Sequence, residues 1–162
     1  MPHSGRLNPS MIVVVRHAEK PEKGSAPHLA VRGKMRAIGL SKLLPKMFHN
    51  VRFIFASTST KNSERPYETI RSTAKKLGLK IRTKFADKQV KKIAKELDRK
   101  RYAGKTVVIC WHHGQIPQLI EELGFPSPYK KWPPEVFDRL IVMDDDGLLN
   151  LPQRLLFGDS GE

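Results

Sequence analysis

Cysteine and long hydrophobic runs are scarce in this chain of 162 residues, and each shortage excludes a class of protein. The single cysteine, Cys110, excludes an internal disulfide framework and predicts a reducing compartment, for which we expect the cytoplasm. No apolar run approaches the roughly 18–20 residues that cross a bilayer, so we expect no membrane span. The polar residues 1–10 also lack the apolar segment of a secretory signal.

Acidic side chains are also few, with 16 Asp and Glu against 30 Lys and Arg, which gives a formal charge of +14. The excess is concentrated, because residues 75–105 carry 13 Lys and Arg but only 3 Asp and Glu. Residues 135–162 are acidic, with 7 Asp and Glu against 2 Arg. A charge of this size indicates an anionic partner, but it does not distinguish nucleic acid, a membrane surface and a small anionic substrate.

Length and hydropathy pattern predict one globular domain over residues 1–162, with its core at about 11–151. The expected strands are residues 11–15, 51–56, 79–83, 106–111, 140–143 and 148–151, and the expected helices are 29–48, 64 or 66 to 77, 87–101 and 116–123. Pro45 is expected to break the last part of the first helix. Strands that alternate with helices predict an α/β fold: a three-layer αβα sandwich with a mostly parallel central sheet.

The most basic segment contains the expected helix at 87–101. Its apolar residues have the spacing of a buried helix stripe, and five cations lie on the solvent side: Lys88, Lys91, Lys92, Lys95 and Arg99. A solvated basic face is the plain interpretation, and polyanion binding through these five residues is the alternative. Phe85 and Tyr102 are the only aromatic residues in this segment, so stacking on single-stranded nucleic acid gains little support.

Polar side chains follow three of the expected strands. The loops after residues 11–15, 51–56 and 106–111 contain, in order, Arg16 and His17, Ser57 and later Arg65, and His112 and His113. Because the carboxyl ends of parallel strands meet at one edge of a sheet, we expect these side chains to converge. Arginine forks and imidazole N–H groups bind the oxygens of a tetrahedral anion. The sequence therefore predicts a phosphate site at this edge.

His17 is the candidate nucleophile of that site. A neutral imidazole is a competent nucleophile near pH 7, and attack on phosphorus would give a phosphohistidine that water then hydrolyses. The cations would stabilise the charge on the phosphoryl oxygens, so we expect no metal and no cofactor. No H-x-x-x-H spacing or cysteine pair favours zinc, and no G-x-S-x-G motif favours a serine hydrolase.

Several motifs within residues 11–143 occur in a familiar order. The run Val15-Arg16-His17-Ala18-Glu19-Lys20 contains R-H-A, and the patterns Leu29-x-x-x-Gly33-x-x-x-Ala37, Arg65-Pro66-Tyr67-Glu68-Thr69, Val107–Trp111 before His113-Gly114, and Leu119 with Leu123-Gly124 follow. Together they resemble the histidine phosphatase (phosphoglycerate mutase-like) superfamily, with Ala18 in place of the usual glycine of R-H-G. The resemblance implies a phosphoglycerate mutase-like fold and a phosphatase.

The resemblance also implies roles for residues. His17 would be the nucleophile, Arg16 and Arg65 the phosphate clamps, and His113 the second histidine on the phosphoryl group. His112 competes for that last role, and Ser57 is a further candidate for binding phosphate.

The general acid has two candidates, Glu19 beside the nucleophile and Asp87 after the third strand. Each also has a plain interpretation. Glu19 would form a surface ion pair with a lysine, and Asp87 would be a helix N-cap.

The short chain leaves no room for the insertions that larger family members use to select substrates, so it resembles the short phosphatases of protein phosphohistidine. The expected partner is a phosphoprotein or a phosphorylated small molecule, and a mutase is less favoured. The alternative function is a catalytically weak or silent family member that acts as a basic module for binding polyanions or phosphoproteins.

Overall fold

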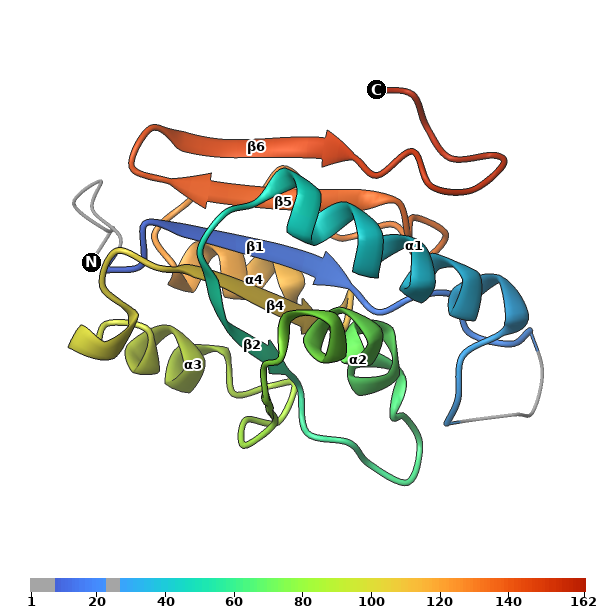
Figure 1. Cartoon of the computed structure of the whole chain (residues 1–162), viewed down its shortest axis with the longest axis horizontal. Coiled ribbons are helices and arrows are strands. Elements are labelled where there is room, and N and C mark those ends of the chain that lie inside the picture. The colour runs from blue at the N-terminus through green and yellow to red at the C-terminus, as the bar shows by residue number, and fades with distance from the viewer. Residues whose placement is uncertain (1–7, 23–26) are drawn as a thin grey trace.

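A six-stranded sheet forms the centre of the computed structural model, which describes residues 8–22 and 27–162 (Figure 1). Its strand order is β3-β2-β4-β1-β5-β6. The strands are β1 (Met11–Arg16), β2 (Val51–Ala56), β3 (Ile81–Arg82), β4 (Thr106–Trp111), β5 (Arg139–Asp144) and β6 (Gly147–Pro152). The first four run parallel, whereas β5 and β6 pair in the antiparallel sense.

Helices cover both faces of this sheet. They are α1 (Val31–Met47), α2 (Arg65–Leu77), α3 (Val90–Glu96) and α4 (Ile116–Glu122). α1 and α2 pack on one face, and α3 and α4 pack on the other (Figure 1). This arrangement confirms the expected three-layer αβα sandwich with a mostly parallel sheet. None of the described helices combines the length and the apolar character that crossing a membrane requires.

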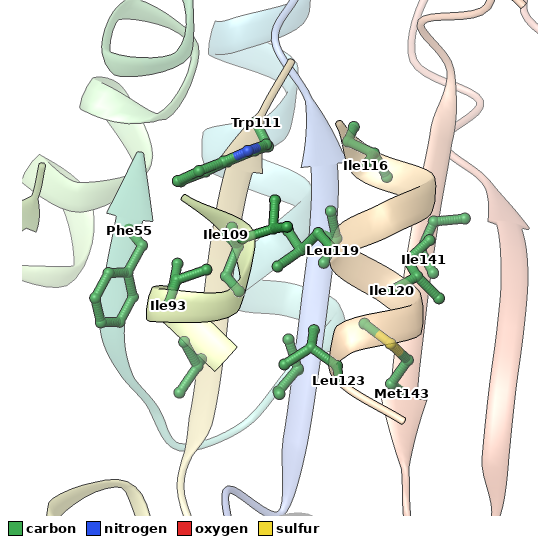
Figure 2. Packing of buried hydrophobic residues seen from close by; sticks show 14 of the residues in the cluster. Phe55, Ile93, Ile109, Trp111, Ile116, Leu119, Ile120, Leu123, Ile141 and Met143 are labelled. Carbon is green, nitrogen blue, oxygen red and sulfur yellow. The ribbon is translucent and has the colours of Figure 1, made fainter. Parts of the chain in front are cut away.

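The alternation of side chains along each strand divides the core between the two faces. On β1, Val13 and Val15 pack beneath α1 and α2, whereas Ile12 and Val14 pack against α3 and α4. All four are fully buried, which contributes roughly 1.5–3 kcal/mol for each side chain. Figure 2 shows the core on the face covered by α3 and α4, where side chains of these helices pack against those of the sheet.

Two expectations about helices are wrong. Pro45 does not break the first helix, because it lies inside α1 only two residues before the helix ends at Met47, so little hydrogen bonding is lost. The expected helix at 87–101 is divided: α3 covers Val90–Glu96, and a 3-10 turn follows at Lys100–Tyr102. The Tyr102 hydroxyl donates a 2.5 Å hydrogen bond to the Glu96 carboxylate, which draws the chain into this tighter turn.

Strand register brings the predicted site residues to one edge. β4 lies between β1 and β2, with Trp111 opposite Arg16 and Cys110 opposite Ala56. The loops that begin at His17, Ser57 and His112 therefore leave the sheet at the same level. They do so beside the amino-terminal end of α2.

Candidate active site

His17 is held as a neutral imidazole in one tautomer. Its backbone N–H donates to the Trp111 carbonyl at 3.0 Å, and its side chain is 2% exposed. The Nδ1 atom lies 2.7 Å from the Ala18 carbonyl oxygen, which can only accept, so Nδ1 carries the proton. Nε2 therefore keeps its lone pair. Burial lowers the pKa of His17 to about 2, and the ring stays uncharged at neutral pH.

Arg16 lies buried beside this histidine and is only partly satisfied. Its Nη1 atom donates to the Pro134 and Val136 carbonyls at 2.7 and 2.8 Å. The guanidinium carbon lies 3.7 Å from the centroid of the Phe137 ring. Its Nε and Nη2 atoms are buried without a partner. Burial lowers the pKa of Arg16 to about 10, which still leaves the group charged at pH 7.

Unpartnered polar atoms gather at this edge. Five buried side-chain polar atoms lack a partner among residues 8–22 and 27–162, and four of them belong to Arg16, Ser57 and Arg65. Burial also lowers the pKa of Arg65, whose charge acts on both Arg16 and His17. A buried donor without a partner costs about 1–3 kcal/mol, so several at one place indicate a site that can bind an anion.

Thr69 joins the R-H-A loop (Arg16-His17-Ala18) to α2. Its hydroxyl accepts from the Ala18 N–H at 2.8 Å and donates to the Arg65 carbonyl at 2.7 Å. Ala18 is fully buried and its φ is negative, so its methyl group causes no backbone strain. Thr69 thus sets the position of the R-H-A loop relative to Arg65. Its place in the expected motif was known from the sequence, but this bond was not.

The two consecutive histidines occupy different places. The rings of His112 and His17 meet edge to face, with centroids 5.2 Å apart. Burial lowers the pKa of His112, although Asp87 acts in the opposite direction. His113 instead lines a recess of about 300 Å³ together with Lys130 and other residues of the following helix and loop. Burial lowers its pKa to about 4.

Glu19 is an acceptor of arginine hydrogen bonds. Arg36 donates to both of its carboxylate oxygens at 2.9 Å, and Arg32 donates to one of them at 3.1 Å. The expected surface pair with a lysine is therefore wrong. A carboxylate whose two oxygens both accept hydrogen bonds from arginines is poorly placed to donate a proton.

Asp87 lies half-buried in the turn before α3, and the expectation that it caps this helix is wrong. The N-cap is Gln89, which makes no capping bond through its side chain. The Asp87 carbonyl accepts from the Trp111 indole N–H at 2.8 Å, which connects this turn to the end of β4. The charge of Asp87 raises the pKa of His112 against the effect of burial, so the carboxylate lies close to the site.

The far wall of the site comes from the segment 132–137. Trp132 is buried and donates its indole N–H to the Val136 carbonyl at 2.9 Å. Phe137 covers Arg16 and also lies 6.2 Å from His17, ring to ring. No local pattern in the sequence records which loop closes over a strand end.

One group of side chains in the described part of the chain has the makings of a metal site: His28, Glu64 and Glu68, with ligand atoms within 4.8 Å of one another. The His28 Nδ1 atom already lies 2.6 Å from a Glu68 oxygen, and this bond accounts for their approach. None of the three was predicted as a site residue. The expectation that the reaction needs no metal stays a prediction.

Comparisons with known proteins give a fold. No protein-family model matches the sequence, and no curated protein does so. Among solved structures, the chain is similar to the protein histidine phosphatase SixA complexed with tungstate, at 11% identity over 88% of this chain and 97% of that one, with a TM-score of 0.62. It is also similar to phosphoserine phosphatase from Entamoeba histolytica in complex with 3-phosphoglyceric acid, at 15% identity over 90% and 99% and a TM-score of 0.60.

A third similar structure is phosphoglycerate mutase from Bacillus anthracis, at 16% identity over 93% of this chain and 95% of that one, with a TM-score of 0.54. The chain therefore has the fold of these proteins, a phosphoglycerate mutase-like fold. This confirms the fold that the motifs predicted.

Proposed function

We propose that this chain is a phosphatase that hydrolyses a phosphomonoester or a protein phosphohistidine through a phosphohistidine intermediate on His17. The observation that carries the proposal is the state of His17. Its Nδ1–H donates to the Ala18 carbonyl, and its Nε2 lone pair is free. The charges of Arg16 and Arg65 are close enough to act on the ring. A neutral nucleophile beside unpartnered cationic donors suits attack on a phosphoryl group.

In the first step His17 Nε2 attacks phosphorus, and the bond from phosphorus to the leaving group breaks. The unpartnered N–H groups of Arg16 and Arg65 would hold the phosphoryl oxygens. The leaving group takes a proton, for which Asp87 is the better candidate because both oxygens of Glu19 are bound by Arg36. Water then attacks phosphorus, the bond from phosphorus to His17 Nε2 breaks, and Asp87 takes the proton that water loses. Inorganic phosphate and neutral His17 are released.

The ring contact with His17 favours His112 over His113 for the second histidine. The Ser57 hydroxyl, fully buried and unpartnered, is proposed to donate to a phosphoryl oxygen. The substrate class follows the same logic. A phosphohistidine has an easily protonated leaving imidazole and needs little help from an acid, and this suits a site where one candidate acid is occupied. The proposed cellular location is the cytoplasm.

The test is turnover of an aryl phosphate in EDTA, together with trapping of acid-labile phosphate on the protein. We expect both with the unaltered chain, and a loss of at least about 10³-fold in kcat for His17→Asn. His49→Asn, at an exposed histidine, is the matched control. Normal turnover by His17→Asn would contradict the proposal. A larger loss for His113→Asn than for His112→Asn would favour His113, as the sequence motif does, as the second histidine.

A second candidate function is polyanion binding, which two adjoining grooves favour. One is lined by Lys84, Phe85, Lys92, Lys95, Glu96 and Arg99, and the other by Phe55, Lys80, Ile81, Arg82, Thr83, Lys84, Glu96 and Tyr102. Their single carboxylate, Glu96, is already bound by Tyr102, Lys84 and Arg99. The grooves are thus rich in cations and poor in acids. They lie beside α3, but Lys88 and Arg99 fall beyond its ends.

Binding of a fluorescent single-stranded RNA at several salt concentrations tests this second candidate. A surface that replaces counterions gives an affinity that falls steeply as salt rises. We expect Lys92→Glu with Lys95→Glu to reduce that slope. Binding with no salt dependence, or binding untouched by the double variant, would remove the candidate.

A further inference from the structure

The chain after β6 contacts α1 through an ion pair between Asp159 and Arg36, with Nη2 2.7 Å from Oδ1. Both side chains are buried, at 4% and 1% exposure. Arg36 Nη1 and Nη2 donate to the two carboxylate oxygens of Asp159 at 2.9 and 2.7 Å. The backbone N–H groups of Leu155 and Leu156 donate to the same carboxylate at 3.0 and 3.2 Å. The Asp159 carboxylate therefore binds both the backbone of its own segment and Arg36 of α1.

Arg36 carries the connection onward to Glu19. Its Nε and Nη2 atoms donate to the two oxygens of Glu19, and its remaining Nη1 hydrogen bond goes to Gln153 at 2.8 Å. All five N–H groups of this guanidinium are thus occupied. Arg32 repeats the connection nearby, since it donates to Glu19 at 3.1 Å and to the Phe157 carbonyl at 2.8 Å.

Glu19 in turn adjoins the group that orients the nucleophile. The Ala18 carbonyl, which accepts from His17 Nδ1, belongs to the peptide unit that Glu19 completes. The Glu19 carbonyl accepts from the Ala30 N–H at 2.9 Å. A Cβ at Gly33 would lie 2.4 Å from the same oxygen, so only glycine lets α1 approach so closely. The Glu19 carbonyl, which belongs to the following peptide, and the Glu19 carboxylate thus both fix Glu19, and through it the peptide bond to Ala18.

We propose that Asp159 is a positioning residue for the His17 nucleophile, which acts through Arg36 and Glu19 on the Ala18–Glu19 peptide. We call Asp159, Arg36 and Glu19 the C-terminal clamp. This inference rests on the proposed function, because it concerns the same nucleophile. Burial opposes ionisation of Asp159, but hydrogen bonds from Arg36 and two backbone N–H groups lower the pKa of Asp159 to about 2.

A purely structural role for Asp159 would lower stability and leave the chemistry of the folded protein unchanged. Three variants separate the two roles. Asp159→Asn keeps the shape of the side chain and removes its charge, and Asp159→Glu keeps the charge. Asp98→Asn is the matched control, because Asp98 is exposed and lines a recess beside Pro9, which precedes β1 at the opposite edge of the sheet.

The first measurement is steady-state hydrolysis of an aryl phosphate, at a temperature where circular dichroism shows each variant to be folded. For Asp159→Asn we expect kcat to fall about tenfold, because the nucleophile is less well aimed. The inhibition constant of inorganic phosphate should stay within about twofold, since Arg16 and Arg65 lie outside the clamp. Asp159→Glu should recover part of kcat, and Asp98→Asn should match the unaltered chain.

The second measurement needs no turnover. Nitrogen-15 spectra of the histidine rings should show His17 with a protonated Nδ1 and a bare Nε2, and Asp159→Asn should replace this single tautomer with a mixture. An unchanged kcat with an unchanged His17 spectrum in the folded variant would overturn the positioning role. If the unaltered chain turns over no phosphate ester or phosphohistidine, the proposed function fails, and the His17 spectra alone decide the clamp.

Discussion

Two cationic regions of this molecule contrast in both charge and burial. The strand-end site draws its cations from Arg16 and Arg65; Arg16 is buried, and both arginines have buried N–H groups without a partner. The segment 75–105 has 13 Lys and Arg. The five of them first suspected of binding are all exposed, and Arg99 is also paired with Glu96.

Unpartnered buried donors therefore indicate a ligand site better than net charge does. An exposed lysine keeps its water and is screened within about 8–10 Å at physiological salt. A buried arginine has lost that water, and the lowered pKa of Arg16 records the cost. A bound anion would replace the hydrogen bonds to water that the arginine lost on burial. We therefore expect changes at the site to have large effects and changes in the basic segment to have small ones.

The largest expected effect comes from the site. Arg65→Ala should lower kcat/KM for an aryl phosphate by about 10²–10³-fold, because it removes a donor that stabilises the transferring phosphoryl group. Lys95→Ala removes a cation from the basic segment and should change kcat/KM by less than about twofold. Steady-state kinetics of both variants test the contrast. Equal losses would mean that total charge, and not burial, supports catalysis.

The next effect is stabilisation by an anion. Inorganic phosphate or tungstate at 100 times its dissociation constant should add about 2.7 kcal/mol to the free energy of unfolding and raise Tm by several degrees. Arg65→Ala should lose most of this shift, whereas Lys95→Ala should keep it. Thermal unfolding monitored by circular dichroism measures both. A shift of equal size in the two variants would place the anion outside the strand-end site.

The fold, and the meeting of most candidate site residues at one edge of the sheet, could be predicted from the sequence, because their signals are local. Apolar runs, the residues after each strand and the R-H-A loop all occur within a few positions of one another. The contact between His112 and His17 could not be predicted. Which of the two consecutive histidines, His112 or His113, faces His17 depends on how the chain leaves β4. The following glycine pointed to His113, and the ring packing favours its neighbour.

The clamp could not be predicted for a different reason. Asp159 lies 123 positions from Arg36 along the chain, and the acidic end of the sequence gives no sign of which carboxylate is buried. Glu19 showed the same limit. Its interpretation as a surface ion pair was reasonable from neighbouring lysines, but its partners come from α1. Long-range pairing of charges has no period and no motif.

Acid should destabilise the site while it leaves the charge of the basic segment in place, since residues 75–105 contain no histidine. The folded-state pKa of His17, about 2, lies below its ordinary value of 6.5. Between these values the unfolded chain binds a proton that the folded chain does not, so stability falls as pH decreases below 6.5. The slope from His17 is at most about 1.4 kcal/mol for each pH unit.

Urea unfolding from pH 7 to pH 4.5 measures this slope. His17→Asn should flatten it, and His49→Asn, at the exposed histidine, serves as the control. His113, with a pKa of about 4, contributes in the same direction, so some slope should persist in His17→Asn. A slope that is unchanged by His17→Asn would contradict a buried neutral imidazole at this position.

The smallest effect should come from reversing charge in the basic segment. Lys92→Glu with Lys95→Glu changes the formal charge by four units in one groove, yet kcat/KM for a small aryl phosphate should change by less than about twofold at physiological salt. Both side chains are exposed, and neither acts on the pKa of Arg16, His17 or Arg65. If the groove guides a phosphoprotein to the site, kcat/KM for that substrate should fall in the double variant, and more at low salt than at high salt. A tenfold loss on the small substrate would show instead that the two cationic regions act as one.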